Sequence, residues 1–401
     1  MNDLAQSDVE FVEEPDTEEI SPVTAAQISQ IVLNATDWTT ETILSQYDRG
    51  NIDIKPRFQR RDAWTIKKKS QFIESIILGL PIPQIVLAER KGERGRYIVL
   101  DGKQRLLTLL QFTGKFEGKY NEFKLSDLAI RSDLKGKKFE DFNTNTILQN
   151  DSNSFYNQTI RTIVIRNWPN TAFLHVVFLR LNTGSVSLSP QELRQALFPG
   201  EFMNYIDDKA SENMFLRKLL GNKEPDFRMR DVEIFIRYLA FAYFLPSYAG
   251  NMSLFLDQAC EKLNLSWETT QDDIIEKANS FSKAMETAEM IFGTENVGKK
   301  WITNGFERRL NRAVLDTLLF YFSNPSIQTI AIEQKSNVMS AFKDLCQTSE
   351  EFRNAIELST KSMKATYDRL SLWGVALRDA LAINFEIPTF DNERKRINFG
   401  N

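Results

Sequence analysis

The stretch that most constrains the fold is residues 98–110, in which three apolar residues lead directly into Asp101 and Gly102. A short apolar run ending at glycine is typical of a buried strand that stops at a sharp turn. Lys103, Gln104 and Arg105 follow at once and open a leucine-rich stretch, which indicates a helix to about residue 112. The sequence therefore predicts a strand, a tight turn and a helix with no intervening loop.

This predicted turn has the properties of a phosphate-binding site. The first N–H groups of a helix have no partner inside the helix, and the helix dipole is positive at that end. Lys103 and Arg105 add two cationic side chains at the same point, beside the flexible backbone of Gly102. We therefore interpret Gly102, Lys103, Gln104 and Arg105 as phosphate-binding. An ordinary helix start with Asp101 as its N-cap is the alternative interpretation.

Asp101 does not suit a simple anion site, because its carboxylate would repel a phosphate. The combination is sensible if Asp101 binds a Mg²⁺ ion that bridges to nucleotide phosphates, or if it positions an attacking water. We therefore predict that Asp101 serves as a metal ligand or orients water, while the residues that follow it hold the phosphates.

A second motif is the basic segment at residues 55–69, which contains seven Lys or Arg residues, one acidic residue and Trp64. Basic side chains beside an aromatic ring can bind a phosphate backbone or stack on a base. A solvated helix face anchored by one tryptophan is the alternative. The predicted DNA-binding residues are Arg57, Arg61, Lys67, Lys68 and Lys69. Arg60 precedes a helix that must pack back onto the sheet, so it is expected to reach the Asp101 site.

A third motif lies at residues 178–194. A predicted helix ends in Asn182-Thr183-Gly184, and Ser189 is followed by Pro190 and by a glutamate at residue 192, which is the spacing of a capping box. Local capping is one interpretation of Glu192. The functional interpretation is that Arg180 and Asn182 line the same cleft as the turn.

The pattern along the chain predicts two folded parts after an acidic tail. Residues 1–22 contain eight acidic residues and no Lys or Arg, which is typical of a disordered segment. Helices are expected at 39–44, 66–78, 103–112 and 171–181, strands at 51–54, 84–89, 97–100 and 159–165, and a loop-like region at 114–158. From about residue 187, amphipathic helical stretches follow one another. We predict domains at 23–186 and 187–401.

Composition excludes several classes of protein. The net charge of −4 means that any DNA contact must come from a local basic patch. The single histidine, His175, excludes His-Asn-His nucleases, HExxH proteases and other sites that need two histidines. Two distant cysteines suit a reducing cytoplasm, and we find no signal peptide and no apolar run long enough to span a membrane. A cytoplasmic protein without membrane contact is expected.

The three motifs, taken in order, resemble the ParB-like domain family found at the N-terminus of GmrS-type restriction proteins and of SspE-type phage-defence effectors. The matching segments are Phe58-Gln59-Arg60 with Trp64, Pro81-Ile82-Pro83, Asp101-Gly102-Lys103-Gln104-Arg105, and Leu181-Asn182-Thr183-Gly184 with Glu192-Leu193-Arg194. The resemblance covers roughly residues 38–200. Lys103 departs from it, because the family often has glutamine there, and the His-Asn-His nuclease of many relatives is missing.

The resemblance implies an α+β fold with a ParB/sulfiredoxin-like N-terminal domain followed by an all-α domain. It also implies an NTP-binding and NTP-hydrolysing protein that uses GTP or ATP with Mg²⁺ in DNA restriction or phage defence, gating DNA cleavage or binding. Asp101, Gln104 and Arg105 would then be catalytic. The nucleotide would be bound by Gln59, Arg60, Gly102, Lys103, Arg105 and Asn182, with Gln104 and Asn182 orienting water or the γ-phosphate.

Two other functions stay open. One is a non-catalytic DNA-binding module that uses the basic segment at 55–69, and the other is a ParB-like metal-dependent DNA nickase at the same cleft. Expected partners are a nucleotide and DNA, with a separate nuclease subunit and a homo-oligomer as further options.

Overall fold

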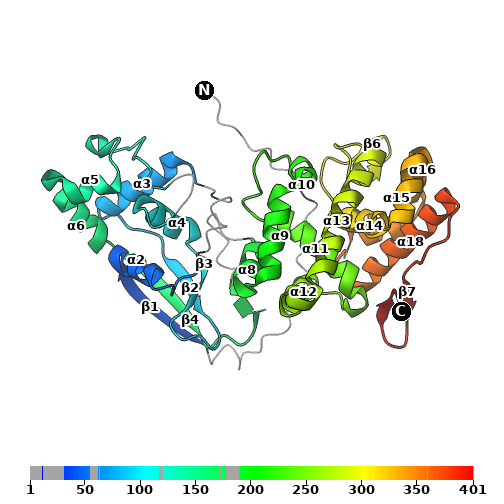
Figure 1. Cartoon of the computed structure of the whole chain (residues 1–401), viewed down its shortest axis with the longest axis horizontal. Coiled ribbons are helices and arrows are strands. Elements are labelled where there is room, and N and C mark those ends of the chain that lie inside the picture. The colour runs from blue at the N-terminus through cyan, green and yellow to red at the C-terminus, as the bar shows by residue number, and fades with distance from the viewer. Residues whose placement is uncertain are drawn as a thin grey trace. The chain divides into compact units, whose positions relative to one another are not determined.

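The computed structural model describes residues 11, 31–54, 62, 64–116, 121–171, 173–174, 176–177, 189–358 and 360–400. The chain divides into two compact units, Ile20–Leu197 and Phe198–Asn401 together with Met1–Glu19. The first unit holds a small sheet with helices, and the second is mainly helical (Figure 1). The predicted α+β fold class is therefore confirmed. The predicted boundaries at 22/23 and 186/187 fall outside the described residues.

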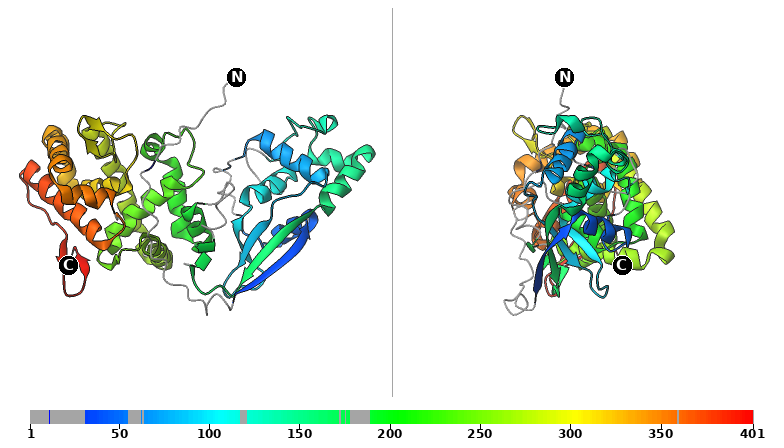
Figure 2. Two further views of the ribbon diagram at one scale, coloured as in Figure 1. Left: turned by 180° about the vertical axis from the view of Figure 1, so that it is seen from behind. Right: turned by 90° about the vertical axis from the view of Figure 1, so that its left-hand side faces the viewer.

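Four strands form one mixed sheet in the N-terminal unit (Figure 2). Their order is β1 (Val32–Thr39), β4 (Thr159–Arg166), β2 (Ile85–Glu89) and β3 (Tyr97–Asp101). β1 pairs antiparallel with β4, β4 parallel with β2, and β2 antiparallel with β3. The parallel pair requires a crossover connection, and the chain from residue 103 to residue 157 provides it with helices.

Both sides of the sheet are covered along β2, β3 and part of β4. Inward residues of β2, β3 and β4 pack on one side against α2 (Thr40–Asp48), α3 (Ile66–Ile77), α4 (Lys103–Phe112) and α6 (Gln149–Asn157). Alternate residues of the same strands, such as Val86 and Ile98, pack on the other side with Trp168 and Leu174. Leu193 of α8 (Pro190–Leu197) belongs to the same cluster. Burial on both sides explains why β2 and β3 are nearly continuous apolar runs.

Most helices and strands predicted for the N-terminal unit are confirmed. The helices expected at 39–44, 66–78 and 103–112 are α2, α3 and α4, and the strands at 84–89, 97–100 and 159–165 are β2, β3 and β4. The strand expected at 51–54 is wrong, because only Ile52 forms an isolated bridge, to Tyr97. The helix expected at 171–181 lies largely outside the described residues.

The loop-like region predicted at 114–158 is also wrong in part. It contains α5 (Phe139–Thr144) and α6, despite many asparagines. The reason is aromatic packing: the ring of Phe112 at the end of α4 lies 5.6 Å from Phe139 and 5.8 Å from Phe155, centroid to centroid. Such tertiary contacts outweigh the low helix propensity of the intervening polar residues.

The second unit is helical, as expected from residue 187 onward. Its helices are α9 (Glu201–Glu212), α10 (Met214–Leu219), α11 (Arg230–Phe244), α12 (Met252–Leu265), α13 (Trp267–Phe292), α14 (Arg312–Phe322), α15 (Pro325–Glu333), α16 (Lys335–Thr348), α17 (Glu350–Glu357) and α18 (Met363–Leu381). Two short hairpins, β5–β6 (Trp301–Ile302 and Gly305–Phe306) and β7–β8 (Thr389–Asp391 and Arg396–Asn398), interrupt and follow them. Among the described residues, no helix has both the length and the apolar character needed to cross a bilayer.

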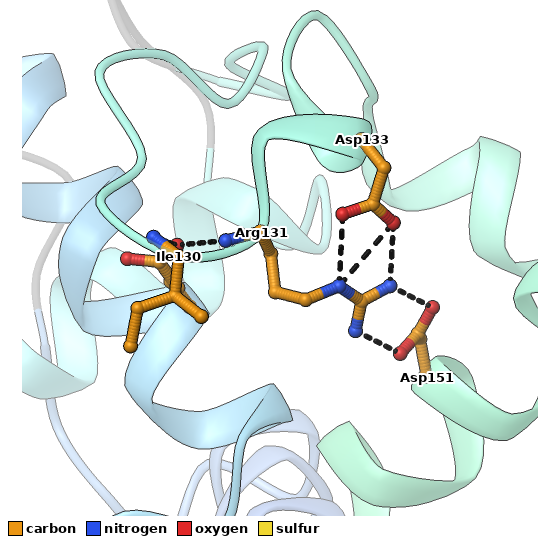
Figure 3. Close-up of polar contacts among 5 residues, drawn as sticks. Ile130, Arg131, Asp133 and Asp151 are labelled. Atoms are coloured by element: carbon orange, nitrogen blue, oxygen red, sulfur yellow. Dashed lines mark hydrogen bonds and ion pairs between the residues drawn. The ribbon is translucent and has the colours of Figure 1, made fainter.

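A buried carboxylate fixes the connection between α4 and α5 to helix α3. Glu74 of α3 accepts hydrogen bonds from the backbone N–H groups of Ala129, Ile130 and Arg131, at 3.1, 2.8 and 2.7 Å. The guanidinium of Arg131 in turn pairs with Asp133 and with Asp151 of α6 (Figure 3). This network holds an otherwise polar connection against the core.

Replacing Glu74 by glutamine tests this anchor. The amide removes the charge and directs N–H groups toward backbone donors, so we expect the free energy of unfolding to fall by about 2 kcal/mol. Urea unfolding measures the change. Glu140→Gln, at an exposed glutamate of α5, is the control and should change stability by less than about 0.5 kcal/mol.

The pKa of Glu74 predicts how the stability difference between wild type and Glu74→Gln depends on pH. Burial raises the pKa of Glu74, but the hydrogen bonds from the Arg131, Ile130 and Ala129 N–H groups outweigh it and leave the pKa lowered. A lowered pKa in the folded state gives stability that is complete above the unfolded value and is lost as the pH falls through the folded value. The stability difference between wild type and Glu74→Gln should therefore shrink below the ordinary pKa of 4.5. A difference that grows in acid would contradict this account.

Candidate functional site

The turn between β3 and α4 has an unusual backbone. Gly102 is the N-cap of α4 with φ +94°, in the left-handed region, and it has no side chain to cap the helix. The β2–β3 register shifts by one residue just before the turn, from Leu87 opposite Val99 to Val86 opposite Asp101. Bulges of this kind are common beside functional sites, where they redirect a side chain. The alternative that Asp101 is the N-cap is therefore wrong.

Space as well as conformation requires glycine at this position. A Cβ atom on Gly102 would lie 2.9 Å from Cγ1 of Ile85 and 3.3 Å from both Nε and one terminal nitrogen of Arg105. The Arg105 guanidinium thus folds back over the glycine. A cationic side chain therefore lies directly against the backbone of the turn.

Arg105 is buried and closes the turn. One terminal nitrogen donates to Oδ2 of Asp101 at 2.9 Å and to the backbone carbonyl of Gln84 at 2.9 Å. Its side chain is 9% exposed and that of Asp101 is 16% exposed, so this pair is largely shielded from water. The predicted metal ligand and a predicted phosphate-binding residue therefore form an ion pair with each other.

Lys103 is buried beside a second carboxylate. Its Nζ lies 2.5 Å from Oε1 of Glu192 on α8. The other oxygen of Glu192 accepts from the Ser189 N–H at 2.7 Å, and Ser189 Oγ accepts from the Glu192 N–H at 3.1 Å. The capping box predicted for Ser189 and Glu192 is confirmed. The same glutamate also connects the start of α8 to the start of α4.

Two polar atoms in the first turn of α4 have no hydrogen-bond partner. They are Oε1 of Gln104 and Nε of Arg105, and both are buried. An unsatisfied buried polar atom costs about 1–3 kcal/mol, and functional sites are where such a cost is expected to persist. On α8, Nε2 of Gln191 and Oε1 of Gln195 are in the same condition. The two helices therefore both carry hydrogen-bonding capacity that the described protein atoms leave unused.

The lysines of the basic segment differ in their exposure to solvent. Lys67 and Lys68 are exposed at the start of α3, and Nζ of Lys68 lies 4.9 Å from the ring centroid of Trp64. Lys69 is fully buried, so its prediction as a DNA-binding residue needs correction: its ammonium pairs with Asp62 at 2.5 Å and donates to Oε1 of Gln111. Burial lowers the pKa of Lys69, although Asp62 acts in the opposite direction.

Several predicted residues lie outside the described residues, namely Arg57, Gln59, Arg60, Arg61, His175, Arg180 and Asn182. The residues that border these segments are held by α4. Asp62, which follows Arg61, accepts from Gln111 at 2.9 Å, and Glu192, in the first turn of α8, pairs with Lys103.

Whether this site can hold a metal ion depends on which side chains can act as its ligands. Within the described ranges, no group of three or more His, Cys, Asp or Glu side chains could hold a metal ion. Mg²⁺ is commonly held by one or two carboxylates together with substrate phosphates, and Asp101 supplies one carboxylate. The residues therefore fit a Mg²⁺ ion that arrives with a phosphorylated ligand.

The sequence reasoning missed two contacts of this site. The sequence indicates only local capping for Glu192, but its pairing with Lys103 connects residues 89 positions apart. In the sequence, Asp62 is simply the one acidic residue of a basic segment. In the structure, its carboxylate accepts hydrogen bonds from Lys69 of α3 and Gln111 of α4. A lone acid within a basic run is a signal that could have indicated an internal ion pair.

Comparison with known proteins gives one match. Residues 40–199 match the family described as GmrSD restriction endonuclease, N-terminal domain, which supports a GmrSD-type family for this part of the chain. The matched range includes α4 and α8 and so contains the whole site described above. No curated protein and no solved structure matches the chain.

Replacing Gly102 by alanine should damage the turn in two ways. The positive φ costs about 1 kcal/mol, and the contact of Cβ with Ile85 adds roughly 1–3 kcal/mol of overpacking. Gly95→Ala is a matched control, because Gly95 has φ +83° with nothing within 4 Å of its Cβ. We expect a clearly larger loss of unfolding free energy for Gly102→Ala by urea unfolding. Equal losses would show that crowding by Ile85 is unimportant.

Proposed function

We propose that the β3–α4 turn binds a nucleoside triphosphate and hydrolyses it. The observation that carries this proposal is the pair of buried, unpartnered atoms Gln104 Oε1 and Arg105 Nε at the start of a helix. A phosphate oxygen could accept from Arg105 Nε, and the helix start adds backbone N–H groups and a positive dipole. The family match of residues 40–199 supports a role in DNA restriction or phage defence.

Each residue of the turn has a distinct proposed role. Arg105 and Lys103 would bind phosphate oxygens, which requires them to exchange their carboxylate partners, Asp101 and Glu192, for the ligand. Asp101 is then available to hold the Mg²⁺ that accompanies the phosphates, and this ion would neutralise phosphate charge. Gln104 would accept a hydrogen bond from the attacking water. Gln59, Arg60 and Asn182 stay proposed nucleotide contacts.

The partner exchange has a physical basis. Before the ligand arrives, the carboxylates of Glu192 and Asp101 pair with Lys103 and Arg105, so that neither cation is buried without a compensating charge. A phosphate carries more negative charge than a carboxylate and can accept several hydrogen bonds at once. It can therefore compete with Asp101 for the guanidinium of Arg105.

Direct DNA binding by the basic segment is a second candidate function. It is favoured by the exposure of Lys67 and Lys68 beside Trp64. The burial of Lys69 reduces the cationic patch that this function would use. A metal-dependent nickase at Asp101 would use the same turn, and it differs by acting on DNA without releasing phosphate from a nucleotide.

Phosphate release tests the proposed NTPase. The purified full chain is assayed with each of the four NTPs and Mg²⁺, with and without DNA, and nucleotide binding is measured in parallel. Arg105→Ala should weaken binding by about 10- to 100-fold, since hydrogen bonds to charged groups are worth about 1.5–3 kcal/mol. Asp101→Ala combined with Arg105→Ala should abolish turnover.

Arg96→Ala is the control for the loss of a positive charge, because Arg96 is exposed just before β3. It should leave binding and turnover unchanged. Stability measured beside activity separates loss of function from loss of folding. Absence of both nucleotide binding and phosphate release in the wild type would contradict the proposal and favour DNA binding. DNA nicking that requires Asp101 and no nucleotide would identify the nickase.

A further inference from the structure

One side of helix α8 is polar and yet buried. Gln191, Arg194 and Gln195 are 0%, 2% and 3% exposed, and Glu192 is buried with them. Successive residues of an α-helix are about 100° apart around its axis, so these four side chains share one side of α8. Leu193 lies on the other side, in the apolar cluster formed with β2 and β3. We call the four polar residues the polar face of α8.

The polar face lies beside the start of α4. Oε1 of Glu192 is 2.5 Å from Nζ of Lys103, the first residue of α4. Gln191 precedes Glu192 in the chain, and Gln195 follows it by three residues, which is the spacing of neighbours on a helix surface. Both glutamines therefore lie close to the turn at which we propose that phosphates bind.

The amide of Gln191 has a fixed orientation. One terminal nitrogen of Arg194 lies 2.6 Å from Oε1 of Gln191. Because a guanidinium can only donate hydrogen bonds, it requires the amide oxygen at this contact and directs the NH₂ group of Gln191 elsewhere. That Nε2 atom is buried without a hydrogen-bond partner, and so is Oε1 of Gln195. The polar face thus offers a free donor and a free acceptor.

We propose that Gln191 and Gln195 bind the nucleobase of the nucleoside triphosphate, an inference that rests on the proposed function of the β3–α4 turn. An ionised phosphate offers only acceptors, so it cannot satisfy Oε1 of Gln195. The hydrogen-bonding edge of a nucleobase carries a donor and an acceptor side by side, and glutamine amides pair with base edges in DNA recognition as well. In this arrangement, α4 holds the phosphates and α8 holds the base.

Burial makes the two amides sensitive to what the ligand carries. A ligand that has phosphates but no base leaves Nε2 of Gln191 and Oε1 of Gln195 unpaired inside the protein, and unpaired buried polar groups are costly. Inorganic tripolyphosphate is such a ligand. We therefore expect it to bind more weakly than a nucleoside triphosphate, although both can occupy the phosphate site.

The test compares these two ligands on the full chain. Isothermal titration calorimetry measures binding of each of the four NTPs and of tripolyphosphate, all with Mg²⁺. Gln191→Met keeps the approximate size of the side chain and removes its donor, so it should weaken NTP binding by about 3- to 10-fold. Tripolyphosphate binding should stay the same, because that ligand does not use the donor.

Two further variants support this comparison. Gln191→Glu retains an oxygen for Arg194 and replaces the NH₂ group by a second oxygen, so it should also weaken NTP binding more than tripolyphosphate binding. Gln149→Met, at an exposed glutamine of α6, is the control and should change the affinity for neither ligand. Urea unfolding of each variant shows whether it is folded.

The hydroxyl groups of ribose also carry donors and acceptors, and a third ligand separates them from the base. A 2′,3′-dideoxynucleoside triphosphate retains the base and lacks these hydroxyls, so it should bind as tightly as the NTP with the same base. If it bound only as weakly as tripolyphosphate, the ribose would be the bound group and the assignment to the base would be overturned.

The outcomes separate this inference from the proposed NTPase. Equal binding of NTP and tripolyphosphate by the wild type, or equal weakening of both by Gln191→Met, would overturn the role of the polar face and leave the phosphate site standing. An unchanged NTP affinity in Gln191→Met would do the same. Absence of binding by both ligands would overturn the proposed function and this inference together.

Discussion

Helix α4 is buried along its whole length, and the N-terminal unit depends on this. All ten of its residues, from Lys103 to Phe112, are buried, including the charged and polar ones. A buried charge must be paired, because desolvation is costly. Lys103 is paired with Glu192 and Arg105 with Asp101, so the start of the helix is connected to α8 and back to β3. Hydrophobic packing thus forces the cations of the turn into an enclosed polar cluster.

The other end of α4 organises the region that carries the basic segment. Gln111 binds Asp62 and Lys69, while Phe112 packs against the aromatic rings of α5 and α6. Helix α4 therefore contacts the end of the basic segment through Gln111 and the helices that precede β4 through Phe112. Its first residues form the turn at which a phosphate would bind.

The sequence was sufficient for elements whose apolar residues follow a simple period, such as α3, α4 and β2. It did not predict β1, an edge strand whose residues are mostly exposed and which is defined by pairing with β4. It missed α5 and α6 because Phe139 and Phe155 are stabilised by Phe112, far away in sequence. The position of the turn was predictable from Asp101 and Gly102. The pairing of Lys103 with Glu192 and the burial of Lys69 were not, because local charge patterns do not reveal distant partners.

Hydrogen exchange at the start of α4 is the most direct test of the central claim, that this buried turn binds nucleotide phosphates. The backbone N–H groups of Lys103, Gln104 and Arg105 lie in the first helical turn and lack intrahelical acceptors. Addition of Mg²⁺ and a non-hydrolysable ATP or GTP analogue is predicted to slow their exchange, while exchange in the β7–β8 hairpin stays the same. Unchanged exchange at these three residues under saturating analogue would contradict the account.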